Sequence, residues 1–401
     1  MTSAPTTSDA PRALRVITRD DSQVERLIGP LLSAKPQASG WQLLSWDAEQ
    51  GICLVFARGS RCVLIELEAH NPDLDCYART RLFNVCARVQ FSSDPDLAEG
   101  DRRLVDAVVR FLRQRETGVS PDSTLAPDRA QVREIRVSRM LIPEGNNRYY
   151  LNPYSGCMVG CSYCYVADRA EFSRRLTGAP PPRWGKWVDI KVNAVEVLRQ
   201  EVRNNPPGVV RMSPILTEPY QPIERRYRVS RSCIEVLQEH GFRPVILTRE
   251  SRILEDVELL RQSGAAVGFS IPTDDDRLRK VFEPGADTIE NRFKALEACA
   301  SAGLVTCVVA QPVLPMNVEN FVKRVAPFVQ VARIDTLHLG EGVAHLFREA
   351  GVEPALTESY QRGIAEELRT RFRDAGVEID DRDDLTSRLE RLMGLGGGRD
   401  I

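Results

Sequence analysis

Hydrophobic positions in the first 116 residues fall mostly in short alternating runs, with two stretches of helical spacing. The alternating runs predict strands at residues 14–18, 41–46, 52–57, 61–68 and 80–91. Apolar residues recurring every three or four positions predict helices at residues 23–33 and 102–115. Gly59 and Ser60, between two strand runs, indicate a hairpin turn. We therefore predict a small α+β domain with a meandering antiparallel sheet at residues 13–116.

From about residue 134 onward the pattern changes to strands and helices in alternation, which favours parallel βα units. Strands are predicted at residues 148–151, 209–216, 243–247, 265–271, 304–311 and 332–339. Helices are predicted at residues 193–203, 230–240, 253–262, 288–302, 318–325 and 360–375. These units are too few for a full eight-unit barrel. An α/β fold with a partial (β/α)6 TIM barrel at residues 134–376 fits the pattern.

The remaining segments lack periodicity. Residues 1–12 are small, polar and proline-containing, as in a disordered tail, while residues 117–133 have the composition of a linker. Residues 377–401, which include three consecutive glycines, are expected to be a frayed C-terminal tail. No apolar run is long enough to span a membrane, and the first residues lack the pattern of a secretory signal. Ten cysteines without such a signal favour a cytoplasmic protein with reduced thiols.

The net charge of −2 gives no support for a broadly basic, nucleic-acid-binding surface. Two stretches are locally rich in arginine, residues 169–186 and residues 225–231. Arginines interleaved with aromatic residues could grip a phosphate backbone and stack on bases. A phosphorylated small molecule, an anionic peptide or an ordinary solvated helix face would use the same residues.

Three cysteines, Cys157, Cys161 and Cys164, lie within one short loop. Such thiolates select zinc, copper(I) or iron–sulfur clusters. A structural zinc site usually has four protein ligands, but the next cysteine is Cys233 and the next histidine is His240. Three thiolates without a local fourth ligand would leave one metal position open for chemistry. A structural zinc loop and plain packing of buried thiols are the alternatives.

Four further cysteines fall in or beside the predicted strands of the first domain. They are expected to pack as apolar residues, and a second cluster is the alternative: Cys53, Cys62, Cys76 and Cys86.

The spacing C-x-x-x-C-x-x-C, with Tyr163 directly before the last cysteine, resembles the hallmark of the radical SAM enzymes. This resemblance implies that the three cysteines hold a [4Fe–4S] cluster and that S-adenosylmethionine binds its fourth iron. It also implies a 5′-deoxyadenosyl radical, a partial barrel fold, and a reductant such as flavodoxin or ferredoxin. The flanking segment from Asn152 to Gly156 strengthens the resemblance.

Polar residues at the predicted strand ends resemble one branch of that family, spore photoproduct lyase and the DNA repair photolyase-like proteins. The resemblance covers residues 148–340 and implies that Tyr163 and Tyr165 take part in radical propagation. It implies that Thr217 and Glu218 meet the amino or carboxylate group of S-adenosylmethionine. The residues that it places against this cofactor are Tyr163, Thr217, Glu218, Arg249, Ser270 and Gln311.

One departure concerns the residues before Thr217, where the lyase resemblance calls for a cysteine that returns a hydrogen atom to the product. Residues 213–216 read Ser-Pro-Ile-Leu and contain no thiol, which argues against thymine-dimer repair. Glu283 and Arg292 are more simply explained as a salt bridge that holds barrel loops. His338 and His345 flank the sixth strand end and are candidates for the substrate pocket.

The sequence thus predicts a radical SAM enzyme that abstracts a hydrogen atom from a small-molecule or peptide substrate in a biosynthetic pathway. The near-neutral charge, the missing thiol and the extra domain favour this substrate class. A nucleic-acid repair or modification enzyme is the alternative, favoured by the arginine stretches. A non-catalytic, metal-stabilised binding protein is a third hypothesis.

Overall fold

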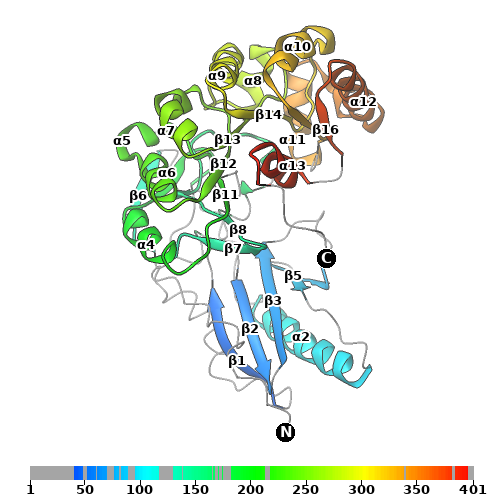
Figure 1. Cartoon of the computed structure of the whole chain (residues 1–401). Helices are drawn as coiled ribbons and strands as arrows, with labels where there is room; N and C mark the ends of the chain where they lie inside the picture. The colour runs from blue at the N-terminus through cyan, green and yellow to red at the C-terminus, as the bar shows by residue number, and fades with distance from the viewer. Residues whose placement is uncertain are drawn as a thin grey trace. The chain divides into compact units, whose positions relative to one another are not determined.

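The computed structural model describes residues 40–47, 52–59, 61–69, 76–80, 83–88, 95–116, 130–137, 139–164, 166–167, 170, 174, 182–212, 217–337, 340–381 and 384–395. The chain divides into two compact units, one of Met1–Ala126 with Asp168–Pro181 and the other of Pro127–Ala167 with Pro182–Ile401 (Figure 1). The N-terminal tail, the strand at 14–18, the helix at 23–33 and most of the linker lie outside the described residues. Within the described part of the chain, no helix is long and apolar enough to cross a membrane.

The first unit is the expected α+β domain. Its five strands form one antiparallel sheet in the order β1-β2-β3-β5-β4, and helix α2 (Pro95–Glu116) packs against that sheet. Leu104, Val108 and Leu112, one helical turn apart, join the core with the inward-facing strand residues. The strand expected at 80–91 corresponds to the shorter β5, and the two-residue β4 precedes it. The bounds are β1 Gln42–Asp47, β2 Ile52–Arg58, β3 Arg61–Ala69, β4 Ala78–Arg79 and β5 Phe83–Arg88.

The second unit, which we call the barrel unit, is built on an eight-stranded sheet in the order β16-β15-β14-β13-β12-β11-β8-β7. All neighbouring pairs from β8 to β16 are parallel, and only β7 joins antiparallel. The expected partial TIM barrel is therefore confirmed. The strands are β7 Ile142–Gly145, β8 Arg148–Tyr150, β11 Val209–Met212, β12 Arg243–Thr248, β13 Ala266–Ser270, β14 Val305–Ala310, β15 Val331–Ile334 and β16 Glu378–Asp380.

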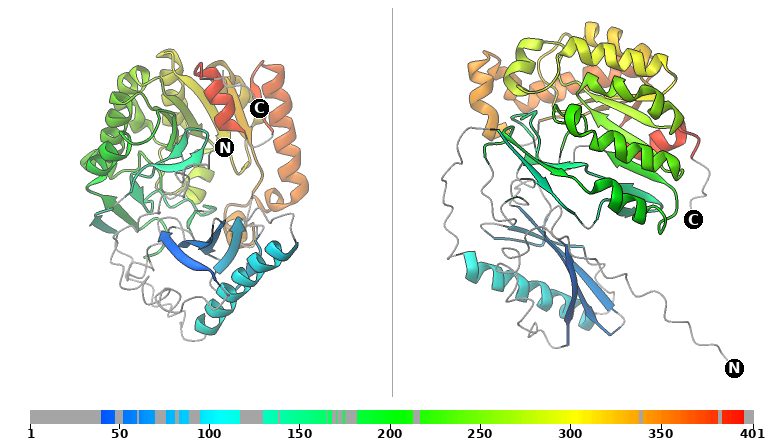
Figure 2. Two further views of the ribbon diagram at one scale, coloured as in Figure 1. Left: turned by 60° about the horizontal axis from the view of Figure 1, so that its bottom comes forward. Right: turned by 90° about the vertical axis from the view of Figure 1, so that its left-hand side faces the viewer.

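Most helices of this unit lie on the outer side of the curved sheet (Figures 1 and 2). Helix α10, for example, buries one apolar stripe, in which Val318, Phe321, Val322 and Val325 face the interior. The helices are α4 Ala194–Glu201, α5 Glu224–Tyr227, α6 Val229–Glu239, α7 Val257–Gln262, α8 Asp276–Phe282, α9 Ile289–Ser301, α10 Val318–Val325, α11 Gly340–Glu349, α12 Glu358–Asp374 and α13 Leu385–Leu392. Short 3₁₀ turns lie at Ser251–Asp256, Ala326–Phe328 and Glu353–Leu356.

A second, smaller sheet supports the start of the cysteine loop. Strand β10 (Trp187–Lys191) pairs in parallel with β6 (Gln131–Ile135) and antiparallel with β9 (Tyr154–Ser155). The sequence pattern did not indicate these strands, because β9 is two residues long and β10 is buried along its whole length. Strand β9 ends two residues before Cys157, so this sheet fixes where the loop begins.

The segment expected to be a frayed tail instead contains β16 and α13. Leu389 and Met393 of α13 pack in one cluster with Val209, Val245 and Val331, which lie at or near the amino ends of their strands. Arg243 Nη1 donates to the carbonyl of Met393 at 2.7 Å. Helix α13 thus covers the end of the barrel opposite to the carboxyl ends of the strands. The sequence missed it because it is short and follows a polar segment.

Substituting Leu389→Ala should lower the free energy of unfolding by about 2–5 kcal/mol, because it removes a buried side chain and leaves a cavity. Urea unfolding of the whole chain measures this effect. Leu392→Ala is the matched control, since Leu392 on the same helix is exposed. Equal unfolding midpoints for the two variants would show that α13 does not contribute to the core.

Candidate active site

The carboxyl ends of three neighbouring parallel strands bring together residues that are far apart in the sequence. Thr248 and Arg249, at the end of β12, both bind Glu218, which follows β11: the Thr248 hydroxyl donates to one carboxylate oxygen and the Arg249 backbone N–H donates to the other at 3.2 Å. Arg249 Nη2 donates to Oγ of Ser270, the last residue of β13, at 2.9 Å. The structure therefore joins four of the predicted strand-end positions in one network, since Thr217 adjoins Glu218.

The cysteine loop is anchored to this strand edge by Gln221. Its side-chain carbonyl accepts from the Met158 backbone N–H at 2.9 Å, and its amide donates to Thr217 Oγ1 at 2.6 Å. Thr217 in turn donates to the carbonyl of Gly156 at 2.7 Å. Sequence reasoning did not single out Gln221. Its position in the polar stretch after β11 was the available signal.

The three cysteines are reduced and lie in one buried cluster with Val159 and Ala286. Burial raises the pKa of each of the three thiols to about 12. The Arg249 guanidinium opposes this effect at Cys161 and Cys164. The loop therefore presents neutral, desolvated thiols beside one fixed cation.

A network of buried charges borders the loop. Glu283 is fully buried and forms an ion pair with Arg292 at 2.6 Å and a longer one with Arg249 at 3.4 Å. It also accepts the Tyr163 hydroxyl hydrogen bond at 2.5 Å. Arg249 Nη1 donates to the Cys161 sulfur. Although burial opposes it, Arg292 and Arg249 hold the pKa of Glu283 below its usual range.

Comparison with known proteins identifies the domain. Residues 151–325 match the family model of the radical SAM superfamily. An uncharacterized protein of Mycobacterium tuberculosis is 31% identical over 180 residues, which cover 43% of this chain and 52% of that protein. The radical SAM Nalpha-GlyT isomerase of Pseudomonas phage M6 is 26% identical over 230 residues, 56% of this chain and 45% of that protein. The chain thus spans about half the length of these relatives.

Residues 151–325 are a radical SAM domain. A solved structure of spore photoproduct lyase complexed with dinucleoside spore photoproduct superposes with a TM-score of 0.44 at 13% identity, covering 62% of this chain and 80% of the lyase. That likeness is too distant to add to the assignment. The matched domain belongs to a superfamily whose members use a [4Fe–4S] cluster and S-adenosylmethionine.

The residues of the loop fit this cofactor. A tetrahedral zinc site needs several ligand atoms around a single ion. No group of three or more His, Cys, Asp or Glu side chains among the described residues converges in that way. In a cluster each thiolate binds a different iron, so convergence is not required. Two buried N–H groups beside the loop, Trp184 Nε1 and Arg249 Nε, have no acceptor among the described residues. Cluster sulfides or a cofactor carboxylate would supply acceptors there.

Other predicted residues lie apart from this network or outside the described chain. Gln311 donates to Asp335 at 3.2 Å, between the ends of β14 and β15. Tyr165 and His338 fall outside the described residues, as do residues 213–216. His345 is exposed on α11. The radical SAM domain therefore brings together Tyr163 and the residues from β11 to β13, while Gln311 remains a separate candidate.

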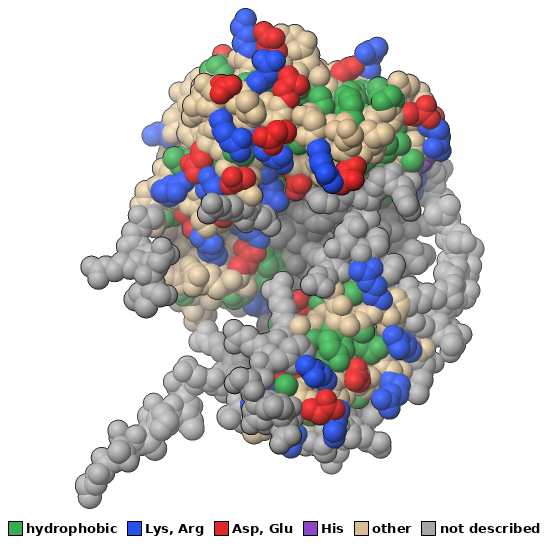
Figure 3. Space-filling view, turned by 90° about the vertical axis from the view of Figure 1, so that its right-hand side faces the viewer, with side chains coloured by type: hydrophobic (Ala, Val, Ile, Leu, Met, Phe, Trp, Pro, Cys, Tyr) green, Lys and Arg blue, Asp and Glu red, His purple; other side chains and the backbone are tan. Residues whose placement is uncertain are grey.

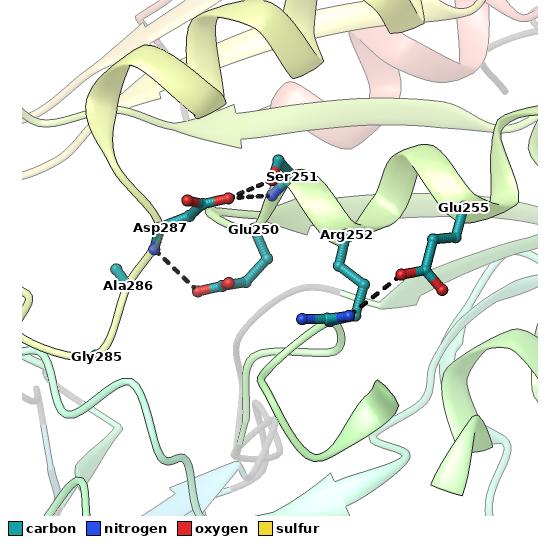
Figure 4. Close-up of a pocket in the computed structure, with 7 residues that line it drawn as sticks. All are labelled: Glu250, Ser251, Arg252, Glu255, Gly285, Ala286 and Asp287. Atoms are coloured by element: carbon teal, nitrogen blue, oxygen red, sulfur yellow. Dashed lines mark hydrogen bonds and ion pairs between the residues drawn. The ribbon is translucent and has the colours of Figure 1, made fainter. Parts of the chain in front are cut away.

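An acidic hollow of about 370 Å³ opens beside the domain's strand ends (Figure 4). The Asp287 backbone N–H donates to Glu250 at 3.3 Å, while the Asp287 carboxylate turns toward Ser251 and accepts from its N–H at 3.2 Å. Arg252 turns toward Glu255 and pairs with it at 3.2 Å. Gly285 and Ala286 complete the wall beside the cysteine loop. Its titratable lining consists of three carboxyl groups and one guanidinium, so the hollow is acidic in composition.

Glu250 should make the stability of the protein depend on pH. Burial, and then the charges of Glu218 and Asp287, raise the pKa of Glu250 to about 8, against about 4.3 in an unfolded chain. The folded state therefore binds this proton more tightly. The stabilisation that the protonated Glu250 carboxyl gives to the folded state is fully present below pH ~4.3 and is lost as the pH rises through about 8.

Thermal unfolding at pH 5 and at pH 8.5 checks this expectation. Wild type should lose more stability than Glu250→Gln over this interval, by a few kcal/mol at most. Glu255→Gln, on the rim of the same hollow, is the control and should behave as wild type. Parallel curves for wild type and Glu250→Gln would contradict the assignment.

Proposed function

We propose that this enzyme abstracts a hydrogen atom from a small-molecule or peptide substrate held at the carboxyl ends of the barrel strands. Cys157, Cys161 and Cys164 would hold the [4Fe–4S] cluster. The cluster and S-adenosylmethionine, when bound, supply an electron and a 5′-deoxyadenosyl radical. The observation that carries the proposal is the buried three-cysteine loop, anchored at the strand edge beside Glu218, Arg249 and Ser270. A reductant such as flavodoxin or ferredoxin would provide the electron.

The strand-end residues suit the zwitterionic part of S-adenosylmethionine. Burial raises the pKa of Glu218, so a neighbouring ammonium group would restore its charged form and gain from the pairing. Arg249 keeps one N–H without an acceptor among the described residues, and a guanidinium suits a carboxylate. The Ser270 hydroxyl lies within hydrogen-bond distance of that guanidinium. We assign Glu218, Arg249 and Ser270 to the binding of S-adenosylmethionine. Thr217 would hold the cysteine loop, and Gln311, at the end of β14, would contact the cofactor from the side opposite to β11.

Tyr163 is the residue assigned to radical transfer. Its hydroxyl is held by the Glu283 carboxylate, which fixes the ring beside Cys161 and Cys164. Because residues 213–216 contain no cysteine, a tyrosine, either Tyr163 or Tyr165, would return the hydrogen atom in any reaction that needs one.

The charges near the site favour a small-molecule or peptide substrate over a phosphate backbone. The acidic hollow lies where a substrate would approach, and carboxylates repel phosphates. Two of the four arginines in the second stretch are neutralised: Arg228 pairs with Glu255 at 3.3 Å, and Arg231 pairs with Asp256 and Glu235. On the face shown in Figure 3, acidic and basic side chains of the barrel unit are interspersed.

The first test is low-temperature EPR of anaerobically reconstituted, dithionite-reduced protein. We expect a [4Fe–4S]⁺ signal that changes when S-adenosylmethionine is added, and its loss in Cys157→Ala, Cys161→Ala and Cys164→Ala. Cys233→Ala is the control, since Cys233 is buried in the same unit but lies on α6. Bound zinc, with no cleavage of S-adenosylmethionine, would instead support a metal-stabilised binding protein.

A nucleic-acid substrate is the second candidate, favoured by two exposed arginines on α5. Arg225 and Arg226 have no ion-pair partner among the described residues, and the Arg226 guanidinium lies 5.3 Å from the centre of the Tyr227 ring. A phosphate-binding face would release counterions, so its affinity would fall with salt.

We expect oligonucleotide binding to be no tighter than about 10⁻⁴–10⁻⁶ M, the usual range for non-specific contact. We also expect its salt dependence to be the same in wild type and in an Arg225→Gln, Arg226→Gln double variant. Fluorescence anisotropy at several salt concentrations measures both. Tight binding, with a salt slope that falls by about 2 in the variant, would favour the nucleic-acid candidate.

A further inference from the structure

The segment from Phe282 to Gly285, which we call the clamp segment, binds the cysteine loop through its backbone. The Ser162 N–H donates to the Phe282 carbonyl at 2.8 Å, and the Gly285 N–H donates to the Val159 carbonyl at 2.9 Å. A Cβ on Gly285 would lie 2.5 Å from a carbonyl oxygen of the loop. Glycine is therefore required for the two backbones to pack directly, and the clamp segment fixes the loop between its cysteines.

Glu283, inside the clamp segment, carries a carboxylate that is shared among three partners. Tyr163 of the cysteine loop donates to Oε1, Arg292 of α9 pairs with Oε2, and Arg249 lies 3.4 Å from Oε1. Arg292 is itself held by the carbonyls of Ser270 and Asp287, at 3.0 and 3.1 Å. The carboxylate is therefore fixed from several sides, and its side chain is 0% exposed.

Arg249 connects this carboxylate to a cysteine that would bind the cluster. Its Nη1 both faces Glu283 and donates to the sulfur of Cys161, while Nη2 donates to Ser270. A guanidinium placed by chance would not meet a carboxylate, a hydroxyl and a sulfur together. A salt bridge that only holds barrel loops would not need the contact with sulfur.

We infer that Glu283 is a positioning residue for the cluster: its carboxylate holds the guanidinium of Arg249 beside the Cys161 sulfur and offsets the charge there. This inference rests on the proposed function, because it presupposes the cluster. It assigns Glu283 and Arg292 more than the structural salt bridge expected from the sequence. Together with Arg249, these residues set the electrostatic environment in which the cluster accepts an electron.

The two charges should act on the cluster in opposite directions. A hydrogen bond to a ligand sulfur and a nearby positive charge both stabilise the reduced cluster and raise its reduction potential. Glu283→Gln removes a negative charge but keeps the size of the side chain and an oxygen that faces both Tyr163 and Arg249, so the guanidinium stays in place. Its midpoint potential should therefore be more positive than that of wild type. Arg249→Gln should shift the potential to more negative values, and the double variant should lie between the two.

An EPR-monitored redox titration of the reconstituted protein, without S-adenosylmethionine, measures these potentials. Glu283→Asp should recover most of the wild-type value, because it restores the charge. Glu224→Gln is a matched control: Glu224 is also buried and accepts a tyrosine hydroxyl, from Tyr154, but it lies at the start of α5 rather than beside Arg249. The midpoint potential of Glu224→Gln should equal that of wild type.

The inference is overturned if Glu283→Gln leaves the potential unchanged, or if it shifts the potential in the same direction as Arg249→Gln. If Glu283→Gln binds too little iron for a titration, the midpoint potential of Arg249→Gln is the deciding measurement. A wild-type potential in Arg249→Gln then overturns the inference. Iron and sulfide analysis of the wild-type protein distinguishes a failure of the proposed function from a failure of the inference about Glu283. A chain without a cluster refutes the proposed function, whereas a loaded chain with unshifted variants refutes only the role of Glu283.

Discussion

Compensation of buried charge is the constraint on which the site depends. Glu218, Glu283, Arg249 and Arg292 all lie at or beside the ends of β11 to β13, and two of them are fully buried. Removing such charges from water costs several kcal/mol per ion unless partners and hydrogen bonds replace the water. Each carboxylate here meets a guanidinium or several donors, so the arrangement is stable only when β11, β12, β13 and the clamp segment keep their register. The cysteine loop inherits its geometry from that register, because Gln221 and Gly285 bind its backbone.

Much of this site could be predicted from the sequence, because its signals are local. The spacing of Cys157, Cys161 and Cys164 and the polar residues after each strand are visible without a structure. Alternating strand and helix patterns then place those residues at one edge, since parallel strands share the direction of their carboxyl ends. The structure confirms this placement for Glu218, Arg249 and Ser270.

The features that escaped prediction depend on contacts between distant segments. Gln221 has no motif of its own, and its importance comes from its contact with Met158. Helix α13 is short and amphipathic, and only the cluster at the amino ends of the strands shows why it folds there. Glu283 and Arg292 could be recognised as a pair, but the contact of Arg249 with Cys161 that links them to the loop requires three-dimensional structure.

The amino ends of the barrel strands contribute packing to the fold, whereas the carboxyl ends carry the candidate site. At the amino ends, Leu389 packs on valines, and tighter packing there has no functional cost. At the carboxyl ends, the protein keeps groups that oppose folding, such as the Glu250 carboxyl with its raised pKa and a buried N–H of Arg249 that has no acceptor in the described part of the chain. A guanidinium has five N–H donors, and the described contacts of Arg249 go to a sulfur, a carboxylate and a hydroxyl. The Nε donor, which has no acceptor among the described residues, is one that a cofactor carboxylate could use without displacing Glu283. Under the proposed assignments, Arg249 would serve the cluster and the cofactor at the same time, and Glu283 would keep it in place for both.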